Sequence, residues 1–393
     1  MRIAYIAPYQ GPGLVKRRPI VRNLSLSGNV KIPLIASALH ANAHQVEIIS
    51  QGEVIGMQGR FYPAFCEPER FHPDIPIYYS SALPIRCLNG LWARRRTLHL
   101  FKARHRLYRY DLVIIHNLKL PQITCANYAM RRLGLPVIFE YEDDVFVDRA
   151  GTAITARVAY LHTAARLLTR VAGCMAASPH LLSQLPSKIP KLLLRGAIGD
   201  DLLKSSEPTS SRHQNWVLFS GTHSRTQGIE QLITAWRTLQ LSDWELHITG
   251  YGELTDKLRQ MAENGRSTVF HGLVNRQELV RLMCAAKICI NPYDVSQTPG
   301  NVFAFKIIEY LAAGAHVITT PMGTLEKEIE RGITYMPNNN PDTIAVTLKQ
   351  VILSGRWRQT AAQYVCTVYG PTAVAKSLDV LVQQVMAGST TRS

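Results

Sequence analysis

The chain has 393 residues, of which 46% are hydrophobic and 18% charged, and this composition is typical of a water-soluble protein with two or three domains. No apolar run approaches the roughly 18 residues that cross a bilayer, which disfavours a membrane span, and the N-terminus lacks the apolar stretch of a signal peptide. The seven cysteines are scattered and contain no CxxC pair, which disfavours a disulfide framework and a zinc site. The net charge of +16 favours a polyanionic partner, which leaves nucleic acid, an anionic membrane and phosphorylated small molecules open.

The first half of the chain alternates predicted strands and helices. The predicted elements are a strand over residues 2–7, a helix over 30–42 and further strands over 45–50, 111–115, 136–140, 173–177 and 192–194. This order is typical of a Rossmann-like domain. Gly11 and Gly13 follow the first strand and allow the backbone to approach a phosphate or an acceptor sugar, with a solvated basic loop as the alternative. Residues 52–76 are rich in Pro and aromatic residues and are expected to form an irregular active-site loop.

Residues 86–109 combine many arginines with leucines and aromatic residues. Two interpretations stay open for this segment. A basic helix with an aromatic and apolar face can lie on an anionic membrane surface, which predicts peripheral contact at the inner membrane face. An ordinary helix can equally pack that face on the sheet, because a predicted strand follows at once.

Candidate ligand-binding residues follow two of the predicted strands. His116 closes one strand, and an acidic run that includes Glu142 and Asp143 closes the next. Ligands of open α/β sheets gather at the carboxyl ends of strands, so these acids could ligate a divalent metal or steer an acceptor hydroxyl. In the alternative interpretation they cap the next helix and pair with Arg149. The polar residues 200–215 are predicted to form a linker between domains.

The second half of the chain predicts another α/β domain. It opens with an apolar run over residues 216–220. Strands are predicted over 245–249 and 288–291, and helices over 229–239, 276–286, from 341 onward and over 372–386. We expect two similar folds in tandem.

Residues 291–321 predict a loop, a helix over 302–313 that ends at Gly314, and a strand over 316–320. Lys306 and Glu309 lie three residues apart on one helix face, with Glu309 about two turns into the helix. The pair suits a nucleotide at the helix N-terminus, because the cation can hold phosphate and the carboxylate can accept the ribose hydroxyls. An ordinary surface ion pair is the alternative.

This stretch resembles the donor-binding helix of the retaining glycosyltransferases of family 4, which have the GT-B fold. Glu309 matches the second Glu of their Glu-x7-Glu motif, and Phe303 matches the Phe inside it. Asn301 replaces the first Glu, and Ala304 replaces a Gly. The run from Ala312 to Ile318 matches the segment that follows the motif.

The resemblance extends to other loops. The family holds the donor diphosphate with an Arg and a Lys near two glycines; here Gly221 and Gly228 match, and Thr222 and Gln227 are uncharged, which leaves Arg225 and Lys306 as the cations. Gly250 and Gly252 are similar to the Gly-x-Gly turn near the nucleotide, and the backbone at His271 and Gly272 is placed to pair with a base. Glu142 stands where the family usually has His, and Asp143 keeps its Asp.

The resemblance implies two Rossmann-like domains that face each other across a cleft. It implies an acceptor-binding domain at residues 1–205, a nucleotide-sugar-binding domain at 206–370, and a terminal helix at 371–393 that crosses back and frays at its end. The implied reaction moves a sugar from a nucleotide-diphosphate donor to a glycan or lipid-linked acceptor with retention, in the cytoplasm, without a metal or other cofactor. The implied catalytic residues are Glu142, Asp143, Lys306 and Glu309. The implied donor-binding residues are Gly221, Arg225, Gly250, Gly252, His271, Gly272, Asn301, Val302, Phe303, Ala304, Lys306 and Glu309. The implied acceptor-binding residues are Gly11, Gly13, His116, Glu142 and Asp143.

Two alternatives share the predicted fold. A nucleotide-sugar epimerase would act on the donor without an acceptor, and a degenerate binding protein would bind nucleotide or glycan without turnover. A nucleic-acid partner is not expected, because the sequence contains no recognised nucleic-acid-binding motif.

Overall fold

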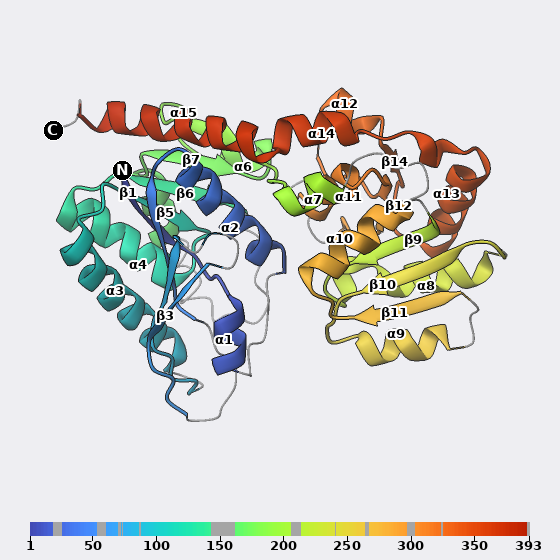
Figure 1. The fold of residues 1–393 in the computed structure, drawn as a ribbon, viewed down its shortest axis with the longest axis horizontal. Coiled ribbons are helices and arrows are strands. Elements are labelled where there is room, and N and C mark those ends of the chain that lie inside the picture. The colour runs from blue at the N-terminus through green and yellow to red at the C-terminus, as the bar shows by residue number, and fades with distance from the viewer. Residues whose placement is uncertain are drawn as a thin grey trace. The chain divides into compact units, whose positions relative to one another are not determined.

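The computed structural model describes residues 1–18, 26–52, 60–69, 72, 74–85, 88–142, 162–205, 214–239, 241–263, 267–296, 303–323 and 325–390 (Figure 1). The chain packs as two compact units: unit 1 comprises Met1–Arg195 with Val374–Ser393, and unit 2 comprises Gly196–Ala373. The predicted domain boundaries lie at 205/206 and 370/371, whereas the structure divides the chain at 195/196 and 373/374.

Unit 1 is built on an eight-stranded sheet with the order β3-β4-β2-β1-β5-β6-β7-β8. The strands are β1 (Arg2–Ile6), β2 (Gln45–Ser50), β3 (Phe65–Pro68), β4 (Pro76–Tyr79), β5 (Leu112–His116), β6 (Val137–Tyr141), β7 (Gly173–Ala176) and β8 (Lys191–Leu193). All neighbours pair in parallel except the edge pair β3 and β4. Strands of a parallel sheet are covered on both faces, which explains why β5 is a continuous buried apolar run.

Helices cover the sheet of unit 1. They are α1 (Pro12–Arg17), α2 (Leu26–Ala41), α3 (Asn89–Tyr108), α4 (Leu120–Tyr128) with its π-helical extension η1 (Ala129–Leu133), a helical segment at 162–168, α6 (Pro179–Ser183) and α15 (Pro371–Thr390). Phe101 of α3 and Ile123 of α4 pack with Ile6 and Val113 of the sheet in one buried core. Figure 1 shows α3 beside α4 on that face.

The terminal helix α15 packs with unit 1 from Val374 onward. The amide of Asn42 donates to the carbonyl oxygen of Ala375 over 2.7 Å, and a Cβ on Gly173 would lie 2.5 Å from Val385. Among the described helices, none is by itself long and apolar enough to cross a bilayer, and Arg356–Tyr369 meets that test only as a bent pair with Pro371–Ser389.

Unit 2 is built on a six-stranded parallel sheet with the order β11-β10-β9-β12-β13-β14. The strands are β9 (Gln214–Ser220), β10 (Glu245–Thr249), β11 (Thr268–Gly272), β12 (Ala286–Asn291), β13 (His316–Thr319) and β14 (Ile333–Tyr335). This is the strand order of the dinucleotide-binding Rossmann fold, in which ligands bind where the order reverses. In unit 2 that point lies between β9 and β12.

The helices of unit 2 enclose two cores, one on each face of its sheet. They are α7 (Asp200–Ser205), α8 (Ile229–Thr238), α9 (Thr255–Ala262), α10 (Arg276–Ala285), α11 (Lys306–Ala312), α12 (Lys327–Glu330), α13 (Pro341–Leu353) and α14 (Ala362–Tyr369), with short 3-10 turns η2 (Arg225–Gln227) and η3 (Arg356–Arg358). Alternate residues of β9 face opposite cores, because Leu218 packs in one and Val217 and Phe219 in the other.

Two predicted irregular segments contain regular structure. Within residues 52–76, Phe65–Pro68 forms the edge strand β3, which pairs with β4 through Phe65 and Tyr79. Their rings stack at 4.6 Å, and this cross-strand pairing overrides the local Pro-rich composition. Within the predicted linker 200–215, Asp200–Ser205 forms helix α7, whose Leu202 is buried in a core of unit 2.

The predicted helix over 302–313 begins only at Lys306. Phe303 and Phe305 are both buried, at 7% and 6% exposure, and residues two apart do not share a helix face. Burying both rings therefore favours a non-helical chain before Lys306. As a result Glu309 lies in the first turn of α11, not two turns into the helix.

Candidate active site

Glycine turns at the carboxyl ends of β9 and β10 form the first part of the site in unit 2. Gly221 follows β9 and has a φ of 151°, and Gly250 follows β10 with a φ of 126°. A Cβ on Gly250 would lie 1.8 Å from the carbonyl oxygen of Gly221, and one on Gly252 would lie 2.4 Å from that of His223. The two turns approach so closely that only glycine fits, and they lie at the point where the strand order reverses.

Gly250→Ala is expected to lower the free energy of unfolding by about 3 kcal/mol or more, because the methyl group adds a backbone clash to an unfavourable φ. Gly272→Ala is the matched control: Gly272 also has a positive φ, 67°, but nothing lies within 4 Å of its Cβ position. This control is expected to cost about 1–2 kcal/mol. Urea unfolding of both variants checks the difference, and equal losses would show that the close approach of the turns is unimportant.

Lys306 points toward these glycine turns. Its Nζ donates to Oε1 of Gln227 over 2.8 Å, lies 4.5 Å from the centre of the Phe219 ring, and would be 2.9 Å from a Cβ on Gly221. No described carboxylate lies within ion-pair distance of it, and burial lowers the pKa of its ammonium group to about 7. A cation desolvated in this way without a counter-ion favours an anionic ligand.

Glu309 lies one turn after Lys306 and is buried. Its Oε1 accepts a charged hydrogen bond from Arg276 of α10, and the Nε of Arg276 donates to Asp201 of α7 over 2.7 Å. The two carboxylates raise the pKa of Arg276 despite its burial. Glu309 is therefore paired with Arg276, a cation that it shares with Asp201. The other carboxylate oxygen of Glu309, Oε2, is not one of the fully buried atoms that lack a hydrogen-bond partner among the described residues. None of the residues that the structure describes donates a hydrogen bond to that oxygen.

Helix α11 is itself tied to β9 by a buried tyrosine, Tyr310. The hydroxyl of Tyr310 accepts a hydrogen bond from the backbone N–H of Ser220 over 2.8 Å and lies 2.9 Å from the Ser220 hydroxyl. This contact fixes α11 against the strand that leads into the Gly221 turn. It therefore also fixes the position of Lys306 and Glu309 relative to that turn.

The other predicted donor residues are more dispersed. Arg225 lies on η2 with its side chain exposed, two residues before Gln227. The side chain of Phe303 packs in a core, with Ala304 against it. The side chain of His271 contacts a second histidine, because its Nε2 lies 2.8 Å from Nδ1 of His247. Asn301 and Val302 lie outside the described residues.

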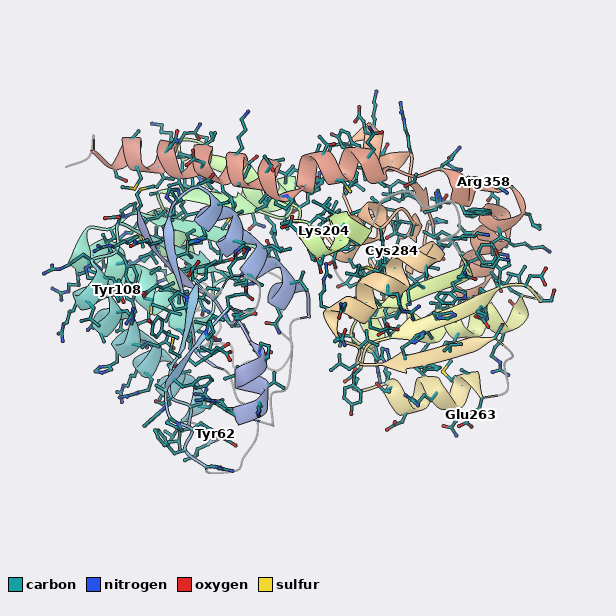
Figure 2. All side chains as sticks on the ribbon, viewed as in Figure 1. Tyr62, Tyr108, Lys204, Glu263, Cys284 and Arg358 are labelled. Carbon is teal, nitrogen blue, oxygen red and sulfur yellow. The ribbon has the colours of Figure 1, made fainter. Side chains whose placement is uncertain are left out.

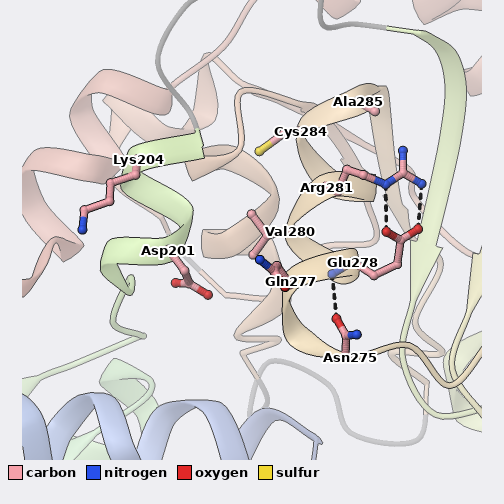
Figure 3. A pocket seen from close by; sticks show the side chains of 9 residues that line it. All are labelled: Asp201, Lys204, Asn275, Gln277, Glu278, Val280, Arg281, Cys284 and Ala285. Atoms are coloured by element: carbon pink, nitrogen blue, oxygen red, sulfur yellow. Dashed lines mark hydrogen bonds and ion pairs between the residues drawn. The ribbon is translucent and has the colours of Figure 1, made fainter. Parts of the chain in front are cut away.

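A pocket of about 870 Å³ lies between α7 and α10 of unit 2 (Figure 3). Asp201 and Lys204 line it from α7, and Val280 and Cys284 form part of its α10 side. No described donor residue of the predicted set lines this pocket. Asp201 connects it to the site, through its bond to Arg276.

Unit 1 buries a second group of ionisable side chains at the carboxyl ends of β5 and β6. The Oε2 atom of Glu140 accepts a hydrogen bond from the hydroxyl of Tyr5 and lies 2.7 Å from Nδ1 of His116. Burial opposes ionisation of Glu140, but its interactions with His116 hold the pKa of the carboxyl below its ordinary value. The predicted acceptor residue His116 is thus positioned by a buried carboxylate.

Glu142 follows β6 and pairs with the buried Lys31 of α2. Its backbone N–H donates to the side chain of Asn117 over 2.9 Å, and Lys31 also donates to the carbonyl oxygen of Leu194 over 2.9 Å. Burial raises the pKa of the Glu142 carboxyl to about 7, the charge of Lys31 opposes this shift, and Glu140 adds to it. Asp143 lies outside the described residues.

Lys31→Met is expected to lower the free energy of unfolding by about 3 kcal/mol, because it leaves Glu142 without its cation. The folded-state pKa of Glu142 then lies further above its unfolded value, so the folded state binds more protons and stability falls as pH rises. The loss should be smallest near pH 5 and larger at pH 8. Urea unfolding at both pH values checks this, and the double variant Lys31→Met/Glu142→Gln should recover part of the loss. A pH-independent loss would contradict the assignment.

The predicted acceptor glycines lie against a carboxylate. The N–H of Gly11 donates to the hydroxyl of Tyr79 over 2.9 Å, and that hydroxyl donates to Oε1 of Glu67 over 2.7 Å. A Cβ on Gly13 would lie 1.7 Å from Oε2 of Glu67. The backbone of this turn was predicted to approach a phosphate or an acceptor sugar. In this structure the polar group that it approaches is the carboxylate of Glu67 in β3.

Sequence reasoning missed the partners of the predicted acids and cations. Arg276 and Lys31 carried no motif, and only the sheet order brings them to Glu309 and Glu142. Among the described residues, no group of three or more His, Cys, Asp and Glu is placed to hold a metal ion. That the reaction proceeds without a metal stays a prediction.

Two family models match the sequence. The model described as "Glycosyl transferase 4-like domain" matches residues 29–189, and the model described as "Glycosyl transferases group 1" matches residues 214–354. Together they span about three quarters of the chain. Among curated proteins, no sequence matches significantly.

Solved structures match over nearly the whole chain. Sucrose-phosphate synthase from Thermosynechococcus elongatus is 18% identical, with a TM-score of 0.74 over 99% of this chain and 100% of that one. HepE from Anabaena in complex with UDP is 13% identical, with a TM-score of 0.67 over 98% and 100%. The catalytic domain of starch synthase IV from Arabidopsis thaliana, bound to ADP and acarbose, is 10% identical, with a TM-score of 0.66 over 98% and 99%. These matches confirm the predicted GT-B fold.

Proposed function

Because this chain belongs to the group 1 glycosyl transferases with a 4-like N-terminal domain, we propose that it transfers a sugar from a nucleoside-diphosphate donor to a glycan or lipid-linked acceptor with retention of anomeric configuration. Solved structures of the same fold contain UDP, UDP-glucose or ADP, which supports a nucleotide-sugar donor. The proposal includes a cytoplasmic enzyme, because a lipid-linked acceptor would be presented at the inner face of a membrane.

The position of Lys306 carries the proposal. Its Nζ lies beside the glycine turn at Gly221, at the reversal of strand order, without a described carboxylate partner. A diphosphate placed there would supply the missing negative charge. Glu309 follows one helical turn later with a carboxylate oxygen that accepts no hydrogen bond from the described residues, which suits the two hydroxyls of a ribose attached to that diphosphate.

The chemistry follows from this arrangement. The bond between the anomeric carbon and the donor diphosphate breaks, and a bond from the acceptor oxygen forms to the same carbon. Negative charge develops on the leaving diphosphate, where the ammonium group of Lys306 stabilises it. Arg225 is the second cation proposed for the diphosphate. Glu142 and Asp143 are assigned to orienting the acceptor hydroxyl, whose proton passes to the oxygen of the departing diphosphate as the new bond forms.

Thermal unfolding in the presence of UDP, ADP, GDP and dTDP tests the donor site. One nucleotide is expected to raise the melting temperature of the wild type, because a ligand that binds only the folded state stabilises it. Glu309→Ala should abolish the shift, and Glu330→Ala, which removes an exposed acid of α12, should keep it. No shift with any nucleotide would contradict the donor assignment.

Proton NMR of the product then tests the reaction. With the matching nucleotide sugar and an acceptor, the new glycosidic bond is expected to have the anomeric configuration of the donor. An inverted product would contradict retention. Conversion of the donor to its epimer without an acceptor would replace transfer with the epimerase alternative.

A further inference from the structure

The positive charge of the protein is concentrated on one part of unit 1. Between Asp74 and Glu140 the only acidic residue is Asp111, and its carboxylate accepts a hydrogen bond from the backbone nitrogen of Arg2 over 2.8 Å. The basic residues of α3 and the segments that follow it are Arg94, Arg95, Arg96, Lys102, Arg104, Arg106, Arg109, Lys119, Arg131 and Arg132. A surface with so little acid carries a positive field of its own.

The side chains of α3 arrange this charge in a line. Residues spaced three or four apart lie on one helix face. We call the residues at this spacing the α3 stripe. It begins at Leu88, just before the helix, and ends at Arg109, just after it. Its members are Leu88, Leu91, Arg95, His99, Lys102, Arg106 and Arg109. All of them are exposed except Lys102, which is partly buried with its Nζ over the ring of Tyr128. The opposite face, with Thr97 and Phe101, is buried in the unit.

The cations of the α3 stripe are not neutralised within the described structure. Arg104, which lies off the stripe, forms the one described ion pair of α3, to Glu47 of β2. No described acid lies within ion-pair distance of Arg95, Arg106 or Arg109. The stripe therefore presents its charge to whatever lies outside the molecule.

Apolar side chains accompany the charge. Leu88 and Leu91 at the start of the stripe are 48% and 50% exposed, and Leu107 near its end is 71% exposed. Phe61, 53% exposed, packs edge-on against Trp92 with 6.1 Å between ring centres. Figure 2 shows Tyr108, which is 40% exposed, at the end of the same helix. Exposed leucines and aromatic rings beside arginines suit the boundary between lipid headgroups and acyl chains.

We propose that the α3 stripe is the surface by which this protein docks on an anionic lipid bilayer. The arginines attract the negative headgroups, and Leu88 and Leu91 at the start of the stripe enter the interfacial layer. A nucleic acid would satisfy the charge but would leave the leucines exposed. The inference goes beyond sugar transfer, and neither donor nor acceptor is needed to test it.

Cosedimentation of the full chain with vesicles tests the proposal. Vesicles of phosphatidylcholine with 30 mol% phosphatidylglycerol are expected to bind the wild type, vesicles of phosphatidylcholine alone are not, and binding should weaken as salt is raised from 0.05 to 0.5 M. Arg95→Glu/Arg106→Glu is expected to lower the partition coefficient at least tenfold. The matched control is Arg237→Glu/Lys349→Glu, which makes the same change of net charge at exposed positions of α8 and α13 and should bind nearly as the wild type does.

Other outcomes overturn the proposal. Equal losses in the two double variants would show that net charge alone drives binding, and equal binding to both kinds of vesicle would remove the electrostatic contact. Stripe-dependent binding that is tighter to a single-stranded oligonucleotide than to anionic vesicles would assign the surface to nucleic acid. Circular dichroism shows whether the variants are folded; if the double variant is not, Arg95→Gln and Arg106→Gln are measured singly. Leu91→Asn should lower the binding that remains at 0.5 M salt.

Discussion

Glu309→Gln is expected to lower kcat/KM for the nucleotide sugar about 100-fold. Replacing a charged acceptor by a neutral one weakens a hydrogen bond by about 1–1.5 kcal/mol. Two ribose hydroxyls would together lose about 2–3 kcal/mol, and each 1.4 kcal/mol corresponds to a factor of ten. The glutamine keeps the volume of the side chain and one oxygen for Arg276. Because the ribose does not react, most of the loss should appear in KM rather than kcat. Initial-rate kinetics over a range of donor concentrations separate the two.

Glu309 also anchors Arg276, so a structural effect must be distinguished from a binding effect. Asp201→Asn weakens the other half of the same ion-pair network without touching Glu309. It is expected to lower the melting temperature but to leave the KM for the donor within about threefold of the wild type. If Asp201→Asn raises KM as much as Glu309→Gln does, Glu309 acts through Arg276 and not on the ribose.

Lys306→Met is expected to lower kcat between 100-fold and 1000-fold, roughly the effect of removing one donor that stabilises charge in a transition state. The unbranched side chain keeps most of the packing over Phe219 and loses the charge together with the hydrogen bond to Gln227. Single-turnover kinetics with saturating donor measure this loss directly. A kcat within tenfold of the wild type would show that another group neutralises the leaving diphosphate.

Donor binding should also depend on pH through Lys306. The pKa of its ammonium group is lowered to about 7 in the free protein, and an anionic ligand raises it again. Above pH 7 binding must therefore take up a proton, so the dissociation constant should increase about tenfold per pH unit. The stability of the free protein changes with pH in the opposite direction. The unfolded chain holds this proton more tightly between pH 7 and 10.5, so this group makes the folded state more stable as pH rises across that window. Calorimetric titration from pH 7 to 8.5 should show the slope in the wild type and a flat profile in Lys306→Arg.

The parallel strands were predictable because burial on both faces produces short apolar runs bounded by turn residues. The predicted strand over 245–249 coincides with β10, and the strand over 45–50 coincides with β2. The start of α11 was not predictable from local pattern, because the burial of Phe303 and Phe305 in tertiary contacts decides it. The edge strand β3 depends in the same way on its pairing with β4.

For the candidate site, the pattern around Lys306 and Glu309 was sufficient to select both residues. Their environments were not accessible, because contacts far apart in the sequence create them. Arg276 reaches Glu309 only when α10 and α11 pack on the same sheet, and Lys31 reaches Glu142 only when α2 covers the end of β6. The lowered pKa of Lys306 and the raised pKa of Glu142 follow from these burials and not from the motif.

The membership of α15 in unit 1 has a consequence for biosynthesis. Val374, Leu378 and Val385 of α15 fill part of the interior of unit 1. Apart from the segment that starts at Val374, all residues of unit 1 precede position 196. A nascent chain that emerges from the ribosome N-terminus first therefore produces the whole of unit 2 before unit 1 can close its core. During that interval the apolar surface that α15 will cover stays open to water and to chaperones. Unit 2, continuous in sequence, can complete its fold first, so the order of folding is expected to be the reverse of the order of synthesis.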